Sequence, residues 1–231
     1  MLTREPIRPA DALREPGQVS HPDPRSDAAA EQTQESLLRQ HQRIAQFVLA
    51  DSVPTPVAIQ FETAKNLYLY AWYVYRFYPA AESLALTTLE FGLRERMEHS
   101  QFDVANKQRR SPPTLPILLR QAVEIGLIRN EGFQRWHDAG QWHAIERHRM
   151  ESLIAAAEQN LDSIEIDDRD AVVTSDDRNW DLVEVLLSTL HKHRNMHAHG
   201  GPYLTPHVLG TFELVMEILN QLFASPATAS Y

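Results

Sequence analysis

The amino-acid sequence predicts an all-α fold, and three features of its pattern support this prediction. Apolar residues recur at intervals of three and four through long stretches, which is the spacing of one face of a helix. No run of alternating apolar and polar residues is long enough to indicate a β-strand. Most of the 14 prolines stand between the periodic stretches or in their first turns, where helices end or begin.

Seven helices are expected, and they follow one another along the chain. The spacing predicts them over residues 37–49, 57–78, 80–97, 115–128, 131–160, 180–198 and 206–223. The first contains Ile44 in its apolar stripe and is ended by Asp51-Ser52-Val53-Pro54. The second has a largely aromatic face that includes Phe61 and Trp72, and Pro79 suits the first turn of the third.

The last four helices are separated by polar or glycine-containing segments. A proline-rich connector, residues 100–113, precedes the fourth helix, and Gly140 is the one weak point in the long fifth helix. An acidic loop over residues 162–178 precedes the sixth, and Gly200-Gly201-Pro202 strongly separates the sixth from the seventh. Together these patterns predict a helical bundle.

The composition of the first 30 residues differs from that of the remaining chain. They hold five of the 14 prolines and few large apolar residues. Such a segment buries too little apolar surface to compensate for the entropy lost on ordering. We therefore expect a disordered arm over residues 1–30 and a single all-α domain over residues 31–225.

The charge and cysteine content exclude several classes of protein. The chain has 22 Lys and Arg against 31 Asp and Glu, a net charge of −9, which excludes a cationic surface all round but not a local basic patch. With no cysteine there is no disulfide, thiolate zinc site or cysteine nucleophile. The first residues lack the apolar stretch of a secretory signal, so a cytoplasmic protein with no membrane association is expected.

The segment from His191 to His199 carries the strongest functional signal. Four histidines fall within these nine residues. Arg194 follows Leu190 by four positions and so continues the apolar stripe of its helix. A guanidinium keeps its charge, and burying it unpaired is costly. Arg194 must therefore meet a carboxylate, a cleft, a partner chain or an anionic ligand.

Arginine and histidine near the end of a helix suit phosphoryl chemistry. His199 stands close to the C-terminus of the helix, where the helix dipole favours the imidazolium. An imidazole can transfer a proton near neutral pH, and a guanidinium can hold two phosphate oxygens.

Three other interpretations of the segment remain open. Arg194 can form a structural ion pair with Glu90 of the third helix, or the histidines can be a solvated run that caps the helix. His193 and His197, one turn apart, can also grip a metal ion. No Glu follows His193 as in the zinc-protease pattern, and the flanking residues Lys192 and Arg194 are cations that would repel a metal.

The run Arg194-Asn195-Met196-His197-Ala198-His199 resembles the signature of the HEPN superfamily of helical domains. That signature is an arginine, usually followed by a polar residue, and a histidine after four to six intervening residues. Here four residues intervene, Asn195 is the polar residue, and Gly200 extends the match. The position on the penultimate helix also suits the family, and the layout of residues 57–223 is similar to it.

This resemblance implies a homodimeric, metal-independent endoribonuclease without cofactors, of the kind found in toxin–antitoxin, phage-defence and stress systems. By position, His199 would move the proton of the ribose 2′-hydroxyl, Arg194 would hold the scissile phosphate, and Asn195 would orient them. His197, His193 and Glu90 are possible accessory residues. The alternative is a family member without catalysis that serves as a nucleotide-binding, RNA-binding or dimeric interaction module.

The spacing of the motif suggests how the two copies of a dimer would cooperate. Five positions along an ideal helix correspond to a rotation of about 140°. Arg194 and His199 would then lie on different faces, so either the helix unwinds near Ala198 or the site is completed across the two-fold axis.

Charged residues outside this motif are candidates for contacts with RNA and with a protein partner. Five cations are candidates for a phosphate track, although a solvated linker would have the same composition: Arg94, Arg96, Lys107, Arg109 and Arg110. The predicted helix over residues 131–160 also has a basic face, with Trp136 and Trp142 nearby. The acidic loop would repel RNA and suits a cationic partner such as an antitoxin.

Overall fold

The computed structural model describes residues 7–26, 34–98, 113–198 and 204–224. This part of the chain is helical and contains no β-strand, so the prediction of an all-α fold is confirmed. Its α-helices are α1 (Gln34–Ala45), α2 (Thr55–Tyr70), α3 (Phe77–Glu98), α5 (Leu115–Glu124), α6 (Gln134–Glu158), α7 (Leu182–Ala198) and α8 (Leu209–Leu222). The short 3-10 turns are η1 (Pro9–Asp11), η2 (Pro16–Gln18), η3 (Asn130–Gly132), η4 (Asp168–Asp170) and η5 (Asp176–Arg178).

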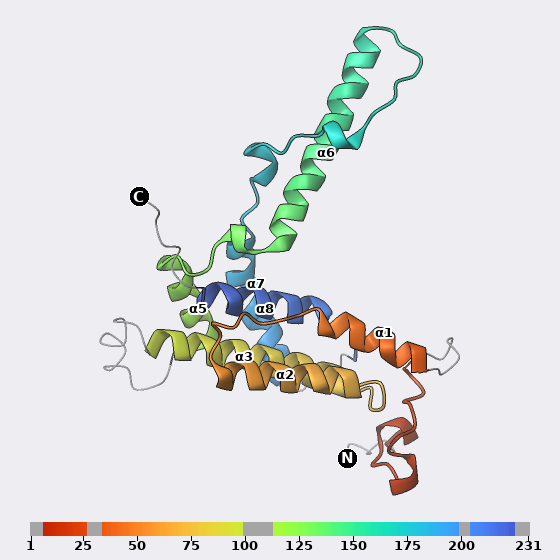
Figure 1. Cartoon of the computed structure of the whole chain (residues 1–231), viewed down its shortest axis with the longest axis vertical. Coiled ribbons are helices and arrows are strands. Elements are labelled where there is room, and N and C mark those ends of the chain that lie inside the picture. Colours follow the sequence, from red (N-terminus) through yellow and green to blue (C-terminus); the bar gives the residue numbers. More distant parts are fainter. Residues whose placement is uncertain (1–6, 27–33, 99–112, 199–203, 225–231) are drawn as a thin grey trace, which may run out of the picture.

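Helix α3 is the centre of the bundle. It packs against α2, α5, α7 and α8, and Figure 1 shows α2 and α3 side by side with α8 running along α3. The shared core contains Phe61, Leu89, Leu93, Phe212 and Leu219, all fully buried. Burying a side chain of this size stabilises the fold by about 1.5–3 kcal/mol. The apolar stripes of the sequence therefore converge on α3.

The predicted helix over residues 57–78 is interrupted in the structure. α2 ends at Tyr70, and α3 begins only at Phe77. The buried Asp23 holds the intervening turn, because its backbone N–H donates to the carbonyl of Trp72 (3.0 Å) and its carboxylate accepts from the backbone N–H of Tyr75 (3.1 Å). These contacts come from a distant part of the sequence, so helical periodicity does not predict the break.

The segment over residues 7–26 is held by ion pairs, one of which joins it to the turn between α2 and α3. Arg25 pairs with Asp23 at 2.9 Å and with Asp11 at 2.7 Å, and Arg76 also pairs with Asp11 at 2.7 Å. Burial alone would raise the pKa of Asp23, but hydrogen bonds from Arg25 and Tyr75 lower it below 3.8. Composition alone indicates disorder here and does not predict these contacts.

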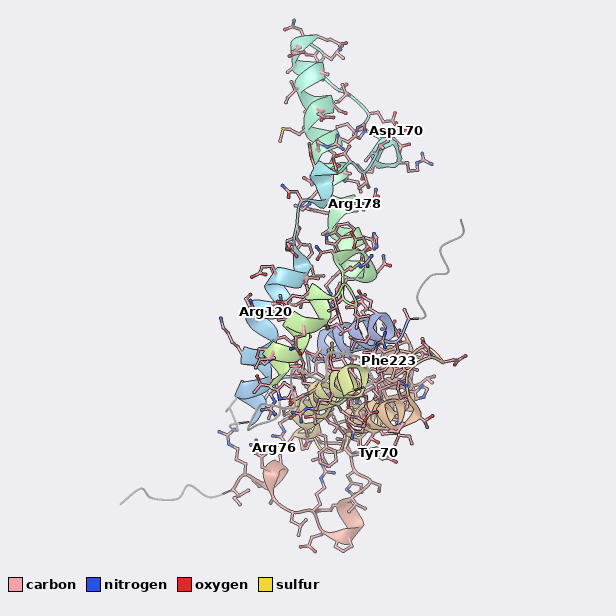
Figure 2. All side chains as sticks on the ribbon, turned by 90° about the vertical axis from the view of Figure 1, so that its left-hand side faces the viewer. Tyr70, Arg76, Arg120, Asp170, Arg178 and Phe223 are labelled. Carbon is pink, nitrogen blue, oxygen red and sulfur yellow. The ribbon has the colours of Figure 1, made fainter. Side chains whose placement is uncertain are left out.

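Helix α6 projects from the bundle as a long arm, and residues 159–181 return alongside it (Figures 1 and 2). Gly140 is buried where the return segment crosses, since an added Cβ would lie 3.0 Å from Cγ of Arg178. The Arg178 guanidinium stacks over the Trp136 ring with 5.6 Å to its centroid. Trp136 is therefore a core residue, whereas Trp142 is 60% exposed.

The basic face predicted for this helix is neutralised by acids. Arg147 pairs with Asp177 at 2.9 Å, and Arg149 pairs with Asp168 at 2.6 Å. Arg135 pairs with Glu213 of α8 at 2.8 Å. The acidic return segment thus binds the arginines of its own arm, which leaves little free positive charge there for RNA.

Candidate functional site

The candidate site lies on α7, which carries the first residues of the motif. Two polar contacts fix its beginning: the Asp181 carboxylate accepts from the backbone N–H of Glu184 at 3.1 Å, and Asn130 accepts from that of Val183 at 2.9 Å. Val183 and Leu190 are buried, and α7 packs against α3 and α5. The predicted apolar stripe of this helix is therefore confirmed.

The guanidinium of Arg194 pairs with a carboxylate of the neighbouring helix α3. Its Nη2 lies 3.3 Å from Oε2 of Glu90 on α3. Nη2 of Arg94 contacts the other oxygen of the same carboxylate, Oε1, at 2.5 Å. Glu90 therefore joins two guanidiniums, one from its own helix and one from α7.

The burial of these three side chains is uneven. The Glu90 side chain is only 12% exposed, whereas those of Arg94 and Arg194 are 36% and 41% exposed. The arginine of the motif thus avoids unpaired burial by lying at the edge of the helix interface. Two cations around one carboxylate leave an excess positive charge that faces solvent, an arrangement suited to an anion such as phosphate.

The i, i+4 spacing of Glu90 and Arg94 on α3 favours their pairing. The contact between Glu90 and Arg194 was one of the alternatives open at the sequence level, and the structure shows it. What the sequence does not predict is that Arg94, considered there for RNA binding, shares the same carboxylate. Arg94 also donates to the carbonyl of Pro113 at 3.4 Å.

Arg96, another of the cations considered for RNA binding, contacts α8. Its Nε donates to the carbonyl of Leu222 at 2.8 Å, at the end of α8. An arginine there satisfies a carbonyl that the helix leaves without an intrahelical donor. Arg96 is thus a structural contact between α3 and α8.

Several predicted residues lie outside the described part of the chain. These are His199, Lys107, Arg109 and Arg110. The backbone of α7 is described through Ala198, but the side chains of Asn195, His197 and His193 are not. The structure therefore places Arg194, Glu90 and Arg94 together and does not test the remainder of the motif.

Two further features concern metals and membranes. Within the described ranges, no three His, Asp or Glu side chains are grouped so that they could hold a metal ion. No helix in those ranges is long and apolar enough to cross a membrane.

Comparison with known proteins yields no match. No family model fits the chain, and neither a curated protein nor a solved structure matches it.

Proposed function

We propose that the protein is a metal-independent endoribonuclease of the HEPN type that acts as a homodimer. The observation that carries the proposal is the Arg194 guanidinium, held at the edge of the bundle by Glu90 and 41% exposed, five residues before His199. An arginine in this state can still approach a phosphate. The excess positive charge shared with Arg94 favours an anionic substrate.

In this proposal the reaction is an internal transfer at phosphorus. His199 takes the proton of the ribose 2′-hydroxyl, and the 2′-oxygen forms a bond to phosphorus while the bond to the 5′-oxygen breaks. The leaving 5′-oxygen takes a proton from water and His199 releases its proton to solvent, so the products are a 2′,3′-cyclic phosphate and a 5′-hydroxyl. Arg194 stabilises the charge on the phosphoryl oxygens, and Asn195 orients the group. DNA lacks the attacking hydroxyl.

The decisive experiment compares cleavage of a labelled single-stranded RNA by the wild-type protein and by His199→Ala, both in EDTA. We expect cleavage with cyclic phosphate ends for the wild type and a loss of at least about 100-fold in the variant. Lys192→Ala is the matched control, because Lys192 is an exposed cation on the same helix, and it should cleave as the wild type does.

Two outcomes would remove the catalytic assignment. One is equal cleavage by His199→Ala, and the other is cleavage of a substrate whose 2′-hydroxyls are replaced by hydrogen. Activity that returns only with an added divalent metal would instead favour the pair His193 and His197.

A second candidate function is a binding or dimeric interaction module of the same type without catalysis. The ion pair between Arg194 and Glu90 favours it, since a guanidinium that is already held can serve structure or anion binding alone. This candidate predicts RNA binding that weakens in Arg194→Gln, with no cleavage by any form of the protein.

The dimer and the regulatory partner belong to the same proposal. Two motifs facing each other across a two-fold axis would bring Arg194 of one copy near His199 of the other, which overcomes the rotation between them on one helix. Sedimentation of the full chain should then give twice the mass of 26.4 kDa. A role in toxin–antitoxin or phage-defence systems would add a protein partner that restrains cleavage.

A further inference from the structure

A separate cavity of about 330 Å³ lies between α1 and the turn that joins α2 to α3. It is lined by residues of α1, by Arg25 and Ser26 of the N-terminal segment, by the turn residues Trp72 and Tyr75, and by Pro206. Neither Arg194 nor Glu90 lines it. Its volume is at the small end of the range for small-molecule sites, which suits a single nucleotide better than an RNA strand.

Three arginines face this cavity, and two of them have little compensating charge. Arg39 and Arg43 stand one turn apart on α1. Arg39 has an ion contact of 3.7 Å with the exposed Glu35, whereas Arg43 forms no ion pair within the described residues. Arg25, the third, is paired with Asp23 and Asp11.

The charge of the described part of the lining is therefore positive. No carboxylate is among the described residues that line the cavity. Arg39 and Arg43 are like charges at i, i+4 on α1, and a bound phosphate would offset their repulsion with charge-assisted hydrogen bonds.

Other residues of the lining are held by contacts within the fold. Gln40 is 7% exposed and donates from Nε2 to the carbonyl of Tyr68 at 2.7 Å. Its Oε1 accepts from the hydroxyl of Tyr78 at 3.0 Å. The Arg25 guanidinium lies over the ring of Tyr75, 5.3 Å from the centroid. These contacts hold the lining in place before any ligand arrives, which lowers the entropy lost on binding.

We propose that this cavity binds a mononucleotide. Arg39 and Arg43 would hold the phosphate, and the ribose and base would lie against the half-buried Tyr75. Guanidiniums recognise phosphate oxygens in pairs, and aromatic side chains bind bases of any sequence through their faces and edges. The site is separate from the motif, so it would exist whether or not the protein cleaves RNA.

The test is calorimetric titration of the full-length protein with adenosine 5′-monophosphate. We expect a saturable 1:1 interaction in the wild type. In the double variant Arg39→Gln/Arg43→Gln, affinity should fall by about tenfold or more. Arg120→Gln is the matched control, because Arg120 is an exposed arginine on α5 far from the lining, and its affinity should equal that of the wild type.

Adenosine and inorganic phosphate separate the two halves of the ligand. If both parts contribute, each should bind at least about tenfold more weakly than the nucleotide. Inorganic phosphate that binds as tightly as the nucleotide would overturn the mononucleotide assignment. The proposal would also fail if the nucleotide does not bind at millimolar concentration, or if the double variant, with an unchanged circular dichroism spectrum, binds it undiminished.

Discussion

Glu90 of α3 lies 3.3 Å from the guanidinium of Arg194 on α7, and the same carboxylate also holds Arg94. The contact connects the helix that carries the motif to the central helix of the bundle. Both guanidiniums pair with this one carboxylate, so removing its charge would leave Arg94 and Arg194 without this ion pair.

Replacing Glu90 by Gln should strengthen RNA binding. Arg94 and Arg194 would no longer be neutralised, so both could engage phosphates. To prevent cleavage, affinity is measured in the His199→Ala background over a range of salt concentrations. The plot of log affinity against log salt should steepen by about 0.7 for each phosphate gained.

The control for this measurement is Glu184→Gln, which removes an exposed carboxylate near the other end of α7. Its salt dependence should equal that of the parent. An unchanged slope in Glu90→Gln would show that these two arginines do not contact RNA.

Gly92→Ala should destabilise the bundle. An ideal Cβ at this position would overlap Cδ2 of the buried Leu219, and it would lie 3.4 Å from Cγ1 of Val57, so the Leu219 side chain or its helix would have to shift. We expect a loss of about 1–3 kcal/mol in the free energy of unfolding, measured by urea denaturation. Gly210→Ala, with nothing within 4 Å of its Cβ, should be neutral or slightly stabilising, and an equal loss in both variants would contradict the packing argument.

Glu217→Gln should raise the melting temperature by a few degrees at neutral pH. Burial raises the pKa of Glu217, and its Oε2 has no hydrogen-bond partner among the described residues, so its ionised form is disfavoured in the folded protein. Glutamine resembles the protonated acid and keeps an oxygen that can accept from the backbone N–H of Gln134, which Glu217 contacts at 2.8 Å.

The pH dependence of that gain follows from the sign of the shift. An acid whose pKa is raised on folding contributes stability below its unfolded pKa and loses it as the pH rises through the folded value. The advantage of the glutamine should therefore vanish below about pH 4. Glu213→Gln removes the pair with Arg135 as well as a like charge near Glu217, so its gain should be smaller than that of Glu217→Gln. A lower melting temperature for Glu217→Gln at neutral pH would refute the prediction.

Acid should loosen the return segment of the arm through Asp177. Hydrogen bonds from Arg147 and Thr174 hold the pKa of this carboxyl well below 3.8. An acid whose pKa is lowered contributes its stability above the unfolded pKa and loses it as the pH falls towards the folded value. Amide exchange over residues 174–178 should therefore lose protection below about pH 4, relative to Asp177→Asn.

Asp170→Asn is the control for this experiment, because Asp170 is an exposed acid of the same segment (Figure 2). It should lose protection with falling pH as the wild type does. A difference between wild type and Asp177→Asn that stays constant with pH would show that the Arg147 pair does not hold the segment.

The fold class and most helices could be predicted because local periodicity determines them. The contact between Arg194 and Glu90 was also foreseeable, since a cation in an apolar stripe needs a carboxylate nearby. The end of α2 at Tyr70 could not be predicted, because it depends on hydrogen bonds from Asp23 that no local pattern contains.

Other features of the structure depend equally on distant residues. Arg96 looks in the sequence like one cation of a basic run, yet its partner is a carbonyl at the end of α8. The cavity beside α1 is assembled from four separate segments, so only the i, i+4 spacing of Arg39 and Arg43 signals it in the sequence.

The projecting arm has a thermodynamic consequence. Beyond Trp136, α6 is supported mainly by its own return segment, and side chains such as Trp142, Met150, Leu153 and Ile154 stay more than half exposed. Its outer half can therefore fray and re-form as a cooperative unit while the bundle stays intact. Heating should give an early, shallow loss of helicity before the main calorimetric peak. The fluorescence of Trp142 should change little in that step, because this side chain is already largely exposed to water.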